Sequence, residues 1–208
     1  MGIRQSYQIQ NEDFQEIFQA FNQQFILACL ILGLEYIHSN NIVIVGLKAE
    51  NILFDEYGYC CISGFEHAFI EDDSDDEFEE QNSKQQEFIS KSLITQYLAP
   101  EVLLRQQPSF EADYYSLGII LYEITTGNKA IQGNYTHEDV IRTILRDKIQ
   151  VKQEDLPEDW DPFGADFMNK LIQKKPQNRM GYYGIEDIKK HSWLKNMPWQ
   201  KIQKKKNC

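Results

Sequence analysis

The chain has 208 residues, of which 42% are hydrophobic and 25% charged, a balance typical of one globular domain with a substantial core. The formal net charge of −11 disfavours nucleic acid as a partner. The longest apolar run, residues 25–34, is too short to span a bilayer, and the four cysteines show no Cys-x-x-Cys spacing. We therefore expect an intracellular protein, cytoplasmic or cytoskeleton-associated.

Both ends of the chain carry weak membrane signals. Gly2 follows Met1 and Ser6 stands at the sixth position, which matches the loose pattern for N-myristoylation of Gly2. The basic tail at 201–208 adds several lysines that would favour anionic lipid. Chance accounts for the first signal and a solvated tail for the second, and a single acyl chain anchors only marginally. We expect no stable membrane attachment.

The first half of the chain predicts helix, then strands. From Asn11 to His38 apolar residues recur at spacings of three and four, which predicts one or two helices, the second largely buried. Short apolar runs between Ile42 and Ile62 are split by a turn-like cluster at 55–58, which predicts short strands.

An acidic stretch follows the predicted strands. Eight of the ten residues from Glu71 to Glu80 are acidic, so they account for most of the net charge. Such runs repel themselves into solvated loops. Ser74 precedes three acidic residues and resembles a target of acidophilic kinases, although a plain solvated insertion explains the run as well. The run lacks the glycine and the ligand spacing of a calcium loop.

The second half of the chain predicts helices with recognisable ends. The segment 114–125 is strongly apolar and is followed by Gly127, a natural helix stop. Thr136 and Asp139 have the spacing of a capping box. Pro162 is placed to open a further helix. Trp193 is expected as a packing anchor near the end of the chain.

Several motifs, in order, resemble eukaryotic protein kinases. Segments 34–41 and 47–55 resemble the helix and catalytic loop, Gly64-Phe65-Glu66 stands in the place of Asp-Phe-Gly, and 97–101 ends in Ala-Pro-Glu. Segment 113–118 looks like the central helix, and 175–181 and 188–194 resemble the closing helices, most like serine/threonine kinases of the AGC and calcium/calmodulin-dependent groups.

The resemblance implies a mainly α fold. We expect a protein-kinase C-terminal lobe with a few short β-strands over residues 1–200 and the N-terminal lobe absent. The acidic activation-loop insertion lies at about 70–90, and the basic tail occupies 201–208.

The same resemblance assigns roles to single positions. Gly46 replaces the aspartate that accepts the substrate proton, and Gly64 replaces the aspartate that binds magnesium, whereas Lys48 and Asn51 survive in the catalytic loop. Among structural residues, Glu101 and Arg179 would form a buried ion pair. Asp113 would cap backbone groups of the catalytic loop.

These assignments predict a catalytically inactive pseudokinase, not an enzyme, that needs no cofactor and binds an unidentified protein partner as a scaffold. Three alternatives stay open. The first is an active serine/threonine kinase that uses ATP and magnesium and is completed by an N-terminal lobe outside this sequence. The second is an adaptor regulated by phosphorylation at Ser74, and the third is a duplicate without function.

Overall fold

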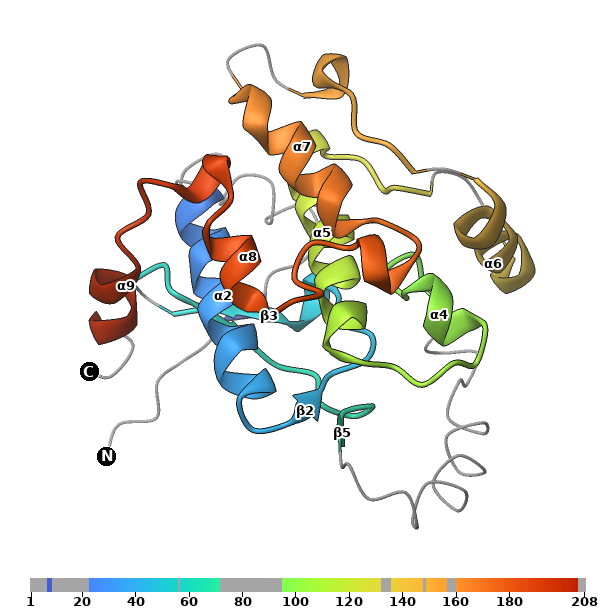
Figure 1. Cartoon of the computed structure of the whole chain (residues 1–208), viewed down its shortest axis with the longest axis horizontal. Helices are drawn as coiled ribbons and strands as arrows, with labels where there is room; N and C mark the ends of the chain where they lie inside the picture. The colour runs from blue at the N-terminus through green and yellow to red at the C-terminus, as the bar shows by residue number, and fades with distance from the viewer. Residues whose placement is uncertain are drawn as a thin grey trace.

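A computed structural model describes residues 7–8, 23–55, 57–71, 95–131, 136–147, 149–156 and 160–205. Gly2, Ser74 and most of the acidic insertion lie outside these residues, so the predictions about them stay predictions. The described part is mainly helical with a few short strands (Figure 1). That general architecture is confirmed.

Helices and short strands make up this part of the chain. The α-helices are α2 (Gln23–His38), α4 (Pro100–Leu103), α5 (Phe110–Thr126), α6 (His137–Arg146), α7 (Pro162–Leu171), α8 (Ile185–Lys189) and α9 (Trp199–Lys205). The strands are β1 (Tyr7–Gln8), β2 (Ile42–Val43), β3 (Ile52–Phe54), β4 (Cys60–Ile62) and β5 (Phe69–Ile70). Single 3₁₀ turns are η1 (Ala49–Asn51), η2 (Gln153–Asp155), η3 (Pro176–Asn178) and η4 (Ser192–Leu194).

The core is built around α2 and α5, which lie near the centre of the molecule (Figure 1). Every residue of α2 from Ile26 to Leu34 is buried, as expected of a helix that is apolar on all sides. Helix α5 ends where the sequence predicts, because Gly127 takes the left-handed conformation with φ 69° and its N–H bonds to the carbonyl of Glu123.

Helix α7 packs closely against α5. Gly118 of α5 has no side chain, and a Cβ at this position would lie 2.7 Å from Ile172 and 2.9 Å from Leu171. The glycine therefore lets the end of α7 approach the α5 backbone. Helix α7 itself begins at Pro162, and the Asp161 carboxylate accepts a hydrogen bond from the Phe163 N–H.

Two small antiparallel sheets carry the strands predicted between residues 42 and 62. One has the order β1-β3-β4 and the other pairs β2 with β5. The turn between β3 and β4 is held by Asp55, whose Oδ1 accepts hydrogen bonds from the N–H groups of Tyr57 and Tyr59. The side chain thus closes the turn locally, as acidic turn residues commonly do.

Helix α6 lies at the edge of the molecule (Figure 1) and starts with the predicted capping box. The Asp139 N–H donates to Thr136 Oγ1, and the Thr136 N–H donates to Asp139 Oδ2. Two N-terminal backbone donors are thereby satisfied. Among the residues described, no helix is both long enough and apolar enough to cross a bilayer.

Candidate active site

The loop between β2 and η1 is fixed by Asp113 of α5, which is completely buried. One carboxylate oxygen accepts the N–H of Ile44 at 3.0 Å and the other accepts the N–H of Val45 at 3.1 Å. His38 Nε2 lies 2.9 Å from the same carboxylate. These charge-assisted bonds hold Val45 in a left-handed conformation with φ 51°, which a β-branched residue rarely adopts unless its surroundings impose it.

Gly46 follows Val45 and also has positive φ, at 93°. Lys48 is half-buried just before η1. The chain therefore delivers a cation to this loop but no carboxylate at position 46. A glycine can neither accept a proton nor orient a hydroxyl through a side chain.

Asn51 and Gly64 share one space. Asn51 is 9% exposed, and its Nδ2 donates to the carbonyl of Ser63 at 3.1 Å. Gly64 has φ 79°, and a Cβ built on it would lie only 1.1 Å from Asn51 Nδ2. The amide of Asn51 thus occupies the place from which a side chain at position 64 would extend.

This arrangement does not fit a magnesium ion. Magnesium requires several oxygen ligands in near-octahedral geometry. Position 64 supplies none, and the Asn51 amide donates towards Ser63. Within the described ranges, no group of three or more His, Cys, Asp or Glu side chains could hold a metal.

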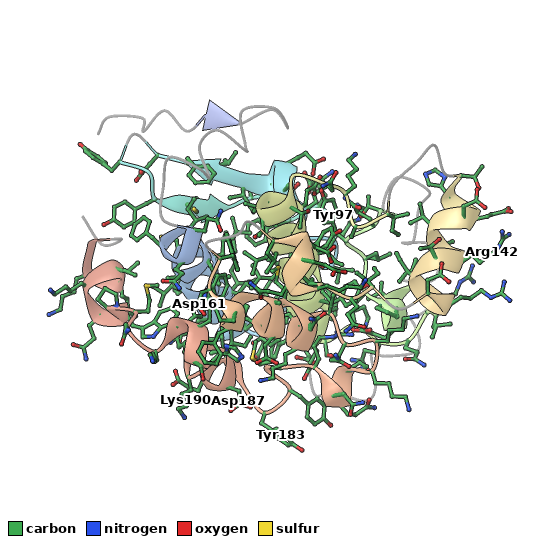
Figure 2. The ribbon with its side chains drawn as sticks, turned by 90° about the horizontal axis from the view of Figure 1, so that it is seen from above. Tyr97, Arg142, Asp161, Tyr183, Asp187 and Lys190 are labelled. Carbon is green, nitrogen blue, oxygen red and sulfur yellow. The ribbon has the colours of Figure 1, made fainter. Side chains whose placement is uncertain are left out.

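An acidic cluster made of Glu50, Tyr97 and Glu123 lies beside the loop. The Tyr97 hydroxyl donates to Glu123 Oε2, and Gln96 Nε2 lies 3.4 Å from the same oxygen. Glu50 Oε2 is buried and makes no hydrogen bond to any residue of the described chain. Figure 2 shows Tyr97 in the middle of the molecule, next to α5.

The electrostatics of the acidic cluster indicate excess negative charge. Burial raises the pKa of Glu123, and the Glu50 carboxylate raises it further, against the opposing effects of the Tyr97 hydrogen bond and Lys129. Burial together with both carboxylates also raises the pKa of the Tyr97 phenol. A guanidinium or ammonium group would relieve this repulsion and satisfy the free oxygen of Glu50.

Glu101 and Arg179 form a bidentate ion pair in the core. Their side chains are 3% and 0% exposed, and the two N–O distances are 2.6 and 2.9 Å. The guanidinium also donates to the carbonyls of Gln173, Lys174 and Glu111. All these bonds compensate the cost of burying the charge and tie α4 to the segment after α7.

The sequence analysis missed the acidic cluster. Tyr97 appeared only within the segment 97–101 that ends in Ala-Pro-Glu, and Glu50 only within the segment 47–55. Glu123 offered a signal that could have been used, because it is a charged residue near the end of an otherwise strongly apolar helix.

Comparisons with known proteins agree on one family. The profile of the protein kinase domain matches residues 5–194. A probable serine/threonine-protein kinase of Dictyostelium discoideum is 30% identical over 96% of this chain and 40% of its own length. Human ribosomal protein S6 kinase alpha-6 is 31% identical over 91% of this chain and 23% of its own length.

A cGMP-dependent protein kinase of Drosophila melanogaster is also similar, at 30% identity over 92% of this chain and 19% of its own length. The chain therefore spans two-fifths or less of these relatives.

These matches contradict the prediction that the chain is not an enzyme. Proteins named as kinases, one of them a probable serine/threonine-protein kinase, align with it through more than nine-tenths of its length. The prediction of inactivity rested mainly on Gly46 and Gly64. Phosphoryl transfer depends mainly on positioning and on electrostatic stabilisation by several groups, so two positions are too narrow a basis.

Proposed function

Because the chain belongs to the protein kinase domain family, we propose that it supplies the peptide-binding C-terminal lobe of a serine/threonine protein kinase, which transfers phosphate from ATP to protein hydroxyls. The single observation that carries the proposal is the acidic cluster. The unpaired Glu50 oxygen and the neighbouring Glu123 carboxylate, whose pKa the Glu50 charge raises, favour binding of a basic side chain of the substrate.

The acidic cluster is placed to orient a substrate relative to the loop. Glu50 belongs to η1, the turn that also carries Asn51 and follows Lys48. A cation held by Glu50 and Glu123 would therefore lie beside the segment that carries Lys48 and Asn51. Binding of remote substrate groups contributes to catalysis by fixing the reacting hydroxyl in position.

Lys48 supplies the positive charge of the loop. It is half-buried, and its ammonium could approach the transferred phosphoryl group and stabilise the charge on its oxygens. Asp113 holds the backbone that leads to Lys48. ATP and magnesium are the expected co-reactants of this family, but the described residues do not form a magnesium site, so the proposal rests on substrate binding.

The test is a fluorescence-anisotropy titration of the whole chain with a labelled serine peptide that carries two arginines. A second peptide with glutamines in their place serves as a comparison. We expect the arginine peptide to bind more tightly, and Glu50→Gln and Glu123→Gln each to weaken it about tenfold or more, because hydrogen bonds to charged groups contribute about 1.5–3 kcal/mol.

The matched control is Glu138→Gln, which removes the same charge from the exposed surface of α6. This variant should bind as the unmodified chain does. Equal affinity for the two peptides would refute the proposal. Mass spectrometry of the peptide after incubation with ATP and magnesium then tests transfer itself.

A further inference from the structure

A pocket lies away from the loop, where α5 meets the end of α7 and the segment after α6. Its volume is about 320 Å³, at the lower end of the range of about 300–1,000 Å³ that is usual for small-molecule sites. Its walls combine apolar and basic groups: Tyr115, Ile149, Ile172, Gln173, Lys174 and Lys175. Among the described residues, no acidic side chain lines it.

Tyr115 supplies a phenol hydroxyl to the pocket. The residue is 1% exposed and lines the pocket wall. Its ring is stacked beneath the Arg179 guanidinium, whose Cζ lies 5.2 Å from the ring centre. A phenol hydroxyl in a pocket wall can donate a hydrogen bond to an acceptor oxygen of a bound group.

Lys174 supplies a cation that is only partly compensated. Its Nζ donates to the carbonyl of Leu145 at 2.9 Å, and burial lowers its pKa although Asp147 opposes the shift. A neutral carbonyl satisfies one of its three donors. An anion in the pocket would satisfy the others and offset the desolvation of the ammonium.

The basic rim is held rigidly. The carbonyls of Gln173 and Lys174 accept hydrogen bonds from Arg179, and Gln173 Nε2 donates to the carbonyl of Asn169. Gly118 stands one helical turn after Tyr115 and allows the close approach of α7. The ion pair and the glycine thus fix the lysines relative to the tyrosine, and a preorganised site loses little entropy on binding.

From this juxtaposition we propose that the pocket between Tyr115 and Lys174–Lys175 is an anion site that binds a phosphate group. Its size suits a phosphorylated side chain better than a nucleotide. The donors match the ligand, because a phosphate monoester offers three strong acceptor oxygens and close to two negative charges at neutral pH. This site is separate from the acidic cluster, which would repel such a group.

The test is an NMR titration of the ¹⁵N-labelled whole chain with sodium phosphate at constant ionic strength. A parallel arm uses N-acetyl-O-phosphoserine amide. We expect saturable shifts of the backbone amides of residues 172–175 in at least one arm. Tyr115→Phe, which keeps the ring, should weaken binding about fivefold or more, and Lys174→Met about tenfold or more.

Lys190→Met is the matched control. Lys190 is an exposed lysine at the outer edge of the molecule (Figure 2), does not line the pocket, and should leave the affinity unchanged. If shifts saturate in just one of the two arms, the phosphate site is supported, and that arm shows whether its ligand is the free ion or a phosphorylated side chain. The proposal is overturned if shifts do not saturate in either arm, or if Tyr115→Phe and Lys174→Met bind phosphate as the unmodified chain does.

Discussion

Replacing Gly64 by alanine tests whether Asn51 fills the space beside it. The new Cβ would lie 1.1 Å from Asn51 Nδ2, so the amide must rotate and give up its 3.1 Å bond to the Ser63 carbonyl. Gly64 also has φ 79°, a conformation that costs an L-residue about 1–2 kcal/mol. Adding about 0.5–1.5 kcal/mol for the lost hydrogen bond gives a destabilisation of about 1.5–3.5 kcal/mol.

A double-mutant cycle separates the two contributions. In an Asn51→Ala background the amide is gone, and the nearest atom of residue 51 is its Cβ, 3.1 Å from the added methyl group. Gly64→Ala should then cost only the backbone strain of about 1–2 kcal/mol. The expected coupling of about 1 kcal/mol exceeds the usual additivity error of about 0.3–0.5 kcal/mol.

Urea unfolding of the four chains, followed by circular dichroism, measures this coupling. The slope of free energy against urea must stay constant across the set for the comparison to hold. Equal costs in the two backgrounds would refute the reasoning. The same geometry predicts that Gly64→Asp alone creates no metal ligand, because its side chain begins at the same occupied point.

Three further changes have defined outcomes. Arg179→Met should lower the free energy of unfolding by about 3–5 kcal/mol, because it leaves the buried Glu101 carboxylate unpaired. The exposed Arg142→Met should change the free energy of unfolding by less than about 0.5 kcal/mol. Similar losses for the two variants in urea unfolding would contradict this. Because the pKa of Glu123 is raised in the fold, this group stabilises the fold at pH values below the ordinary glutamate pKa of 4.5, and the contribution is lost as pH rises through the raised pKa. Glu123→Gln should therefore flatten that part of the curve of stability against pH. An unchanged curve would contradict the raised pKa of Glu123. Thr136→Ala removes the capping box of α6 and should speed hydrogen exchange in its first turns, at a cost of about 1 kcal/mol; unchanged exchange would argue against the cap.

Local patterns made much of the fold predictable. The apolar runs identified α2 and α5, and the positions of Gly127, Thr136 and Pro162 located helix ends within a residue or two. These helix ends could be predicted because each depends on interactions between residues within one or two helical turns of each other in the sequence.

The candidate sites depend on contacts between distant parts of the chain. Tyr97 meets Glu123 across 26 positions, and the Lys174 side chain reaches Leu145 across 29. No periodic pattern in the sequence predicts contacts between residues so far apart in the chain. That the Asn51 amide fills the space beside Gly64 was also visible only in the structure. The sequence shows that position 64 has no carboxylate, but it does not show which group occupies that space.

The ion pair of Glu101 and Arg179 has a consequence for synthesis of the protein. The partners are 78 residues apart, so closing that loop costs about 4 kcal/mol of chain entropy beyond a constant. At roughly 5–20 residues per second, the ribosome releases Arg179 about 4–16 s after Glu101. During that interval the Glu101 carboxylate lacks its Arg179 partner, and the core cannot close around it. A nascent chain interrupted before residue 179 would therefore expose unfinished core to chaperones and proteases.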